Sequence, residues 1–189
     1  MTTGRNRLIA VCLAALIVAA GSTAHATPEE DYAKGLELYK QSDVIAAMGW
    51  LEKAATAGNP DAQVLLAQIL DGSNDNARAL DLYRKAAEQG SAAGELGLGG
   101  MYAAGEGIER DPEQALHWIR MAAEKDHGPA IVALADAYRL GSLGLEPDPA
   151  QAREWLARGV EAGYEPAVRS LQSLDASESP PPAEGENKR

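Results

Sequence analysis

Few residues in this sequence are of types and spacings that could support catalysis or bind a metal. Apart from His25 near the N-terminus, the histidines are His117 and His127, and neither belongs to a His-Glu-x-x-His pattern or stands beside a cysteine. A zinc site or a metallohydrolase would need such a ligand set. The Gly-x-Ser-x-Gly and Ser-x-x-Lys patterns of serine hydrolases are also absent. We therefore predict no catalytic residue, no cofactor-binding residue and no metal ligand. We interpret His117 as a surface side chain and His127 as favoured by the C-terminal dipole of a preceding helix.

A run of glycines invites comparison with a phosphate-binding loop. It reads Gly97-Leu98-Gly99-Gly100 and is followed by Gly105-Glu106-Gly107. The third glycine of a dinucleotide fingerprint would fall at Tyr102, no Lys-Ser or Lys-Thr pair follows, and no strand is expected before it. The run therefore does not indicate a nucleotide site.

The N-terminal segment, residues 1–26, has the organisation of a secretory signal peptide. Arg5 and Arg7 precede an apolar run over residues 8–20, and Ala24-His25-Ala26 supplies the small residues before a cleavage site. The apolar run is shorter than the roughly 20 residues that span a bilayer. We expect cleavage after Ala26 and a mature protein that is periplasmic or secreted.

Removal of this segment would change the chemistry open to the protein. Cys12, the only cysteine, lies in the middle of the apolar run, where it does not suit lipid attachment, and it is lost with the segment. A mature chain without a thiol has no disulfide, cysteine nucleophile or thiolate metal site. The formal net charge of the whole chain is -11, and the lost segment carries only positive charges. We expect no nucleic-acid partner and no membrane insertion after cleavage.

The chain contains four internal repeats. The clearest repeat position is an alanine followed three residues later by a large apolar side chain, and four residues before each alanine stands an aspartate. The alanines are Ala47, Ala79, Ala115 and Ala152, the aspartates are Asp43, Asp75, Asp111 and Asp148, and all three tryptophans, Trp50, Trp118 and Trp155, fall at the large apolar position. The intervals between successive alanines are unequal and the first is the shortest, which places insertions and deletions in loops.

The sequence pattern of each unit predicts a helical hairpin. The aspartate is an N-cap for the second helix, and proline follows it at the first helical position in two units. The second helix ends at a glycine suited to the left-handed conformation, Gly58, Gly90 and Gly163, with Asp126 in the third unit. The first helix carries an apolar stripe at helical spacing, as in Ala62, Leu66 and Leu70. We interpret the tryptophans as core residues, since they lie on the apolar stripe of the second helix.

These motifs resemble the Sel-1-like repeat family, which is related to tetratricopeptide repeats. The third unit carries the resemblance best, with Leu98-Gly99-Gly100-Met101-Tyr102 and Gly105-Glu106-Gly107-Ile108, then Asp111, Ala115, Trp118, Ala122 and Ala123. The first unit departs from the pattern, with Gly35 in place of the leucine. The resemblance implies an all-α fold, a right-handed superhelix of four helical hairpins plus a C-terminal capping helix. Cysteine-rich members of the family have been associated with penicillin binding, but a mature chain without cysteine does not share that feature.

The expected organisation is a signal peptide over 1–26, repeats over 27–58, 59–90, 91–127 and 128–163, a capping helix over 164–175 and a disordered tail over 176–189.

The resemblance also implies a protein-binding function. By analogy with tetratricopeptide repeats, the concave face would present residues two and five positions after the repeat leucine of the first helix. These are Glu37, Lys40, Gln68, Asp71, Gly100, Asp136 and Arg139, each of which is alternatively an ordinary solvated side chain. We expect a scaffold that binds another protein or peptide, as an adaptor or regulator of an envelope complex or sensor kinase. The alternative is a cell-wall or β-lactam hydrolase of the same repeat family.

Overall fold

The computed structural model describes residues 26–178. The predicted signal peptide, except for Ala26, lies outside the described residues, as does the predicted tail from residue 179 onward. The described part contains nine α-helices and no strand, in the order α1 Pro28–Lys40, α2 Val44–Thr56, α3 Pro60–Gly72, α4 Asn76–Glu88, α5 Ala92–Ala104, α6 Pro112–Glu124, α7 Gly128–Leu140, α8 Pro149–Glu161 and α9 Glu165–Glu178. Each of α1 to α8 has 13 residues.

The helix boundaries follow local side-chain chemistry. The aspartates predicted as N-caps precede α2, α4, α6 and α8, and the carboxylate of each accepts a hydrogen bond from a backbone N–H of the first turn. After α6 the third unit places Asp126 at φ +59°, where the other units use glycine. Both predictions are confirmed. At the C-terminus, α9 runs to Glu178, beyond the end at residue 175 predicted for the capping helix.

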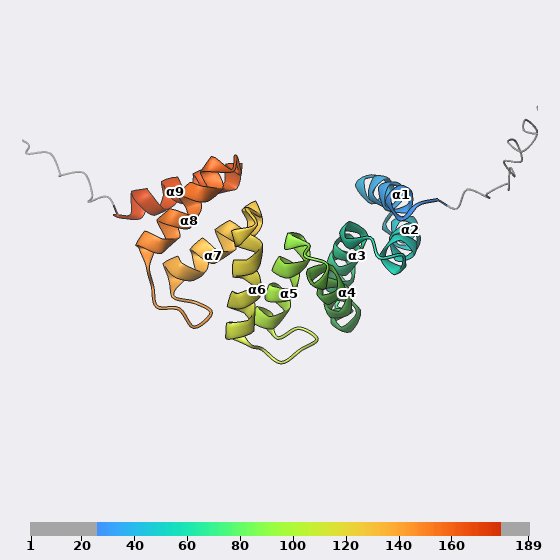
Figure 1. The fold of residues 1–189 in the computed structure, drawn as a ribbon, viewed down its shortest axis with the longest axis horizontal. Coiled ribbons are helices and arrows are strands. Elements are labelled where there is room, and N and C mark those ends of the chain that lie inside the picture. The colour runs from blue at the N-terminus through green and yellow to red at the C-terminus, as the bar shows by residue number, and fades with distance from the viewer. Residues whose placement is uncertain (1–25, 179–189) are drawn as a thin grey trace, which may run out of the picture.

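The helices pack as consecutive hairpins that follow an arc from α1 to α9 (Figure 1). Each helix contacts the next one along the chain. In addition, α3 contacts α1 and α5, and α7 contacts α5 and α9. Among the described helices, no two consecutive second helices are in comparable contact. The first helices of the units therefore touch one another in series and form one layer, and the second helices form another in which neighbours are splayed apart.

Small residues allow this close packing. Ala47, Ala79, Ala115 and Ala152, which marked the repeats, are all fully buried. In α5, a Cβ atom added to Gly99 would lie 2.8 Å from Cγ1 of Ile119 in α6. The neighbouring Gly97 faces the ring of Tyr83 in the same way. Two glycines of the run in α5 are thus explained by close helix packing.

The interpretation of the tryptophans as core residues is wrong in its detail. Trp50, Trp118 and Trp155 are half-buried, and the ammonium of Lys53 lies over the Trp50 ring at 4.2 Å from its centroid. The buried position is the next one along the helix. It is occupied by Leu51, Tyr83, Ile119 and Leu156. The tryptophans lie at the margin of the apolar stripe, where one face packs and the other reaches solvent.

No helix among residues 26–178 is both long enough and apolar enough to cross a bilayer.

Candidate interaction surface

The seven residues predicted for the concave face all lie on first helices. Glu37 and Lys40 are on α1, Gln68 and Asp71 on α3, Gly100 on α5, and Asp136 and Arg139 on α7. All are exposed or half-buried, and they recur at matching positions along the layer of first helices.

The structure brings together Asp136 and Arg139 of this set through a direct contact. The guanidinium of Arg139 donates to Asp136, with 2.8 Å between Nη2 and Oδ1. Glu37 instead accepts a hydrogen bond from Gln41 on its own hairpin. At Gly100 a side chain would meet no atom within 4 Å, so the middle of the surface is open.

Asp71 lies close enough to the buried Tyr83 to affect it. Burial, reinforced by the Asp71 carboxylate, raises the pKa of Tyr83 to about 12. The phenol is therefore neutral at physiological pH, and it serves packing rather than proton transfer.

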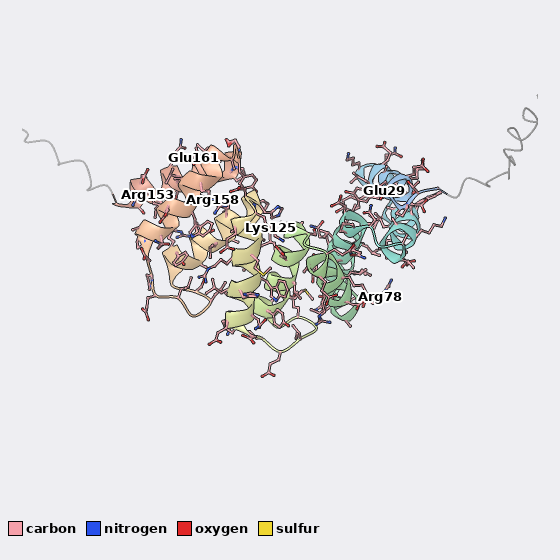
Figure 2. All side chains as sticks on the ribbon, in the orientation of Figure 1. Glu29, Arg78, Lys125, Arg153, Arg158 and Glu161 are labelled. Carbon is pink, nitrogen blue, oxygen red and sulfur yellow. The ribbon has the colours of Figure 1, made fainter. Side chains whose placement is uncertain are left out.

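A groove between α2 and α4, not anticipated from the sequence, lies in the layer of second helices. Its volume is about 510 Å³, and its lining includes Leu66 and Leu82. Charged side chains border it. Arg78, which Figure 2 labels on α4, pairs with Glu52 of α2 at 2.8 Å, and Lys85 pairs with Asp81 at 2.6 Å. These ion pairs are exposed and contribute little to stability, but they make the groove polar at its rim. The sequence signal of the Arg78–Glu52 pair is weak, since the two residues lie on different repeats.

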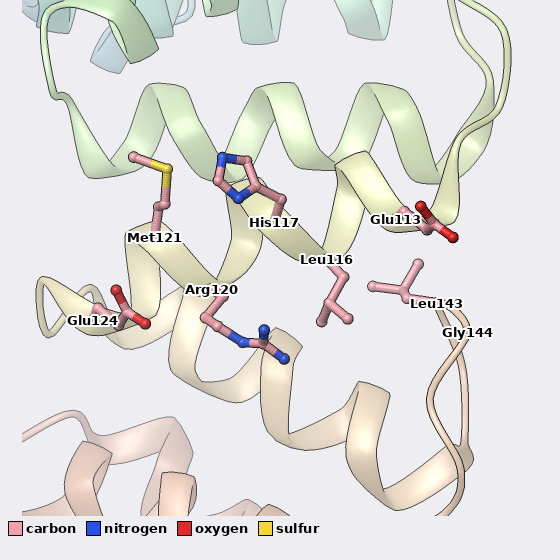
Figure 3. Close-up of a pocket in the computed structure, with 8 residues that line it drawn as sticks. All are labelled: Glu113, Leu116, His117, Arg120, Met121, Glu124, Leu143 and Gly144. Carbon is pink, nitrogen blue, oxygen red and sulfur yellow. The ribbon is translucent and has the colours of Figure 1, made fainter.

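A second groove lies beside α6, with a volume of about 430 Å³. Arg120 and Met121 line it, and Leu143 from the α7–α8 loop closes one end (Figure 3). His117 is exposed on the same face of α6, as predicted. The Arg120 guanidinium donates to the hydroxyl of Tyr138 at 3.3 Å.

The most buried charged group of the described residues connects α5 to the end of α6. Glu95 is 1% exposed, and its Oε1 lies 2.5 Å from the ammonium of Lys125, which also donates to the carbonyl of Gly90 at 2.9 Å. The other carboxylate oxygen, Oε2, is buried and has no hydrogen-bond partner within residues 26–178. The sequence pattern gave no sign of this pair, because its two members lie far apart along the chain.

His127 does not behave as the sequence predicted. It is the N-cap of α7 and half-buried, without a side-chain capping hydrogen bond. Burial lowers the pKa of its imidazole, and the nearby Glu95 carboxylate only partly opposes this. The expected stabilisation of a charged imidazole by the preceding helix is therefore not the dominant effect.

No group of three or more His, Cys, Asp or Glu side chains in the described part of the chain is arranged to hold a metal ion. The features that remain are extended surfaces: a layer of first helices with polar side chains at several matching positions, and grooves along the second helices.

A family model described as Sel1 repeat matches residues 32–59, 60–91, 92–127 and 128–164, so each match covers one helical hairpin. The chain belongs to the Sel1 repeat family. Sel1 repeats build helical scaffolds that generally mediate protein–protein interaction rather than catalysis.

The chain is similar to a solved Sel1 repeat structure and to two further proteins in sequence. The crystal structure of a Sel1 repeat protein from Oxalobacter formigenes is 28% identical, covers 78% of this chain and 61% of its own, and superposes with a TM-score of 0.70. A protein of Neisseria meningitidis is 36% identical over 52% of this chain. Chitin synthase regulatory factor 3 of Schizosaccharomyces pombe is 32% identical over 60% of it. The chain spans only 22% and 13% of the lengths of these last two relatives.

Proposed function

We propose that this Sel1 repeat protein is an exported scaffold, periplasmic or secreted, that binds another protein across its layer of first helices. The observation that carries the proposal is the direct contact of α1, α3, α5 and α7 in series, with polar side chains at matching positions on α1, α3 and α7 and the open Gly100 on α5. Helices that touch in series form the inner layer of a curved array, because the splayed layer must lie on the outside of the curve. A continuous inner surface suits a protein or peptide ligand.

The location and the role rest on separate arguments. The signal-peptide pattern over residues 1–26 supports export. An adaptor or regulator of an envelope complex or sensor kinase fits this location, and the relative from Schizosaccharomyces pombe is itself named a regulatory factor, which is in keeping with regulation by contact.

The test reverses the polarity of the Asp136–Arg139 ion pair on the inner layer. Asp136→Lys combined with Arg139→Glu keeps an opposite-charge pair on α7, so the free energy of unfolding should stay within about 0.5 kcal/mol of wild type. Tagged mature protein should capture a stoichiometric partner from an envelope extract, and the double variant should reduce that capture at least tenfold in a salt-sensitive manner.

Two further variants make the test specific. Glu88→Lys on α4 lies outside both grooves and is the matched control, which should retain the partner. Glu113→Lys places a positive charge in the groove beside α6. Loss of capture with Glu113→Lys alone would move the binding site to the second helices. Turnover of a chromogenic β-lactam or of purified cell wall by the mature protein would overturn the scaffold in favour of the hydrolase.

A further inference from the structure

The two long hairpin loops fold back over the preceding unit. In the α5–α6 loop, Gly107 at φ +69° approaches α4 so closely that a Cβ atom there would lie 2.7 Å from the carbonyl oxygen of Asn76. Ile108 of the same loop is half-buried against the core. In the α7–α8 loop, Leu143 packs in the same manner and lies beside Glu113 of α6 (Figure 3). Each loop thus covers the first turn of the second helix before it, and each inserts one aliphatic side chain.

The second unit lacks such a loop. Only residues 73–75 connect α3 to α4, which explains why Ala47 and Ala79 are closer together in the sequence than the later repeat alanines. Consequently no loop covers the first turn of α2. The residues at this turn are Val44 and Ile45, which are 38% and 88% exposed.

The uncovered turn is apolar, unlike its equivalents. The residues at the repeat position of Ile45 are Ala77, Glu113 and Ala150, which are small or charged. Of the five large hydrophobic side chains exposed in the described residues, Val44 and Ile45 are consecutive and both lie in this turn. Single exposed apolar side chains are ordinary, but adjacent ones mark a contact surface. We call these two residues the tip patch.

The rest of the chain defines what would fit the tip patch. At the equivalent turns of α4 and α6, the covering group is a short glycine-containing loop with one Ile or Leu. The charge around the patch adds a second condition. Residues 27–76 hold nine acidic and three basic side chains, and around the turn of the same hairpin the acidic Glu37 and Asp43 and the basic Lys40 are exposed. A segment with lysine or arginine beside its aliphatic residue would complement that charge.

We infer that the tip patch docks an extended segment of a partner protein that carries one aliphatic residue flanked by basic residues, entering as the α5–α6 loop enters over α4. The inference rests on the proposed scaffold function for the existence of a partner, but it uses a different surface from the inner layer. The partner completes a contact that the shortened second unit leaves open.

The probe is the peptide Gly-Lys-Gly-Ile-Lys-Arg, which copies residues 105–110 with both glutamates replaced by lysine. Titrated into ¹⁵N-labelled mature protein, it should shift the amide resonances of residues 39–48 at millimolar concentration. Replacing its isoleucine by serine should weaken binding about tenfold, because the buried aliphatic side chain supplies most of the contact. The acidic parent sequence should bind several-fold more weakly at low salt, and the difference should shrink as salt is added.

Two variants of the protein keep the test independent of the peptide. Ile45→Asp should weaken binding at least tenfold, whereas Leu140→Asp, at an exposed aliphatic residue of another hairpin, should leave it unchanged. Replacing Ser73 and Asn74 by the loop 105–110 should cover the patch, reproduce the amide shifts without peptide, and abolish binding.

Three results would overturn the inference: no shifts at residues 39–48, equal binding by the Ile45→Asp variant, or Ile45-dependent self-association in sedimentation, which would make a second copy the occupant. Failure of the proposed scaffold function would give a different result. The Asp136/Arg139 variant would then capture the envelope partner as well as wild type does, while the peptide would still bind the tip patch.

Discussion

One buried repeat position is occupied by side chains of a different chemical type in each of three consecutive units. Three residues before the repeat leucine, unit two has Gln63, unit three has Glu95 and unit four has Ile131, all nearly inaccessible to solvent. Gln63 pairs with Gln89 at the end of α4, Glu95 pairs with Lys125 at the end of α6, and Ile131 packs in an apolar cluster. An amide pair, an ion pair and an apolar contact are thus alternatives at one position of one fold. They differ in how much each residue depends on its partner.

The ion pair should show the strongest dependence. Lys125→Met removes the charge that compensates Glu95 and should lower the free energy of unfolding by about 3 kcal/mol, because a buried carboxylate would be left unpaired. Because Lys125 is partly exposed, we expect this loss in the free energy of unfolding to lie at the lower end of the range seen when one member of a buried ion pair is removed. Urea unfolding at neutral pH measures it.

The double variant Glu95→Ile with Lys125→Ala copies the apolar arrangement of unit four. It should recover the loss to within about 1 kcal/mol of wild type. A double variant as unstable as Lys125→Met would show that packing at this position, rather than an unpaired charge, sets the stability.

The amide pair should depend less on its partner. Gln89→Ala removes the donor to Gln63 Oε1, and we expect a loss of about 1 kcal/mol because the stranded oxygen is neutral. The Nε2 of Gln63 would still donate to the carbonyl of Ala55. If this variant were less stable than Lys125→Met in the same urea experiment, the ranking of charged over neutral partners would be reversed.

The smallest effect should come from His127, which lies next to the ion pair. Its folded-state pKa is lowered by burial, so the unfolded chain binds the proton more readily. Acidification from pH 7 to 5.5 should therefore lower the free energy of unfolding, and solvent screening at this half-buried site keeps the change below about 1 kcal/mol. His127→Asn should remove this pH dependence and add a cap like Asn59, worth about 0.5–1 kcal/mol. An unchanged pH profile in the variant would assign the titration to another group.

The sequence was most informative where structure depends on neighbouring residues. Asp111 caps α6 through bonds to residues two and three positions away, so its role follows from local spacing. The repeat position of Trp118 was also visible, but periodicity alone does not separate the centre of an apolar stripe from its margin, and Ile119 proved to be the buried residue. The ion pair of Glu95 and Lys125 was not predicted from the sequence, because it depends on how α5 packs against the end of α6.

The surfaces were partly predictable for the same reason. The polar positions of the first helices follow from helical periodicity, and Asp136 and Arg139 are indeed accessible on α7. The grooves and the tip patch depend on where a loop of the next unit comes to rest. The short interval between Ala47 and Ala79 indicates from the sequence that a loop is shortened. Only the position of Gly107 over Asn76 in the structure shows that a longer loop would have covered the first turn of α2.

The equal length of α1 to α8 has a consequence for how such a protein changes in evolution. Helices of 13 residues give a band about 20 Å wide that has the same width in every unit. A duplication or deletion of one whole unit would lengthen or shorten this band without altering its cross-section, provided that the new junction brings compatible residues together. The reach of the binding surface is therefore set by the number of units, and its local chemistry by substitutions within each unit. Size and specificity can be selected independently.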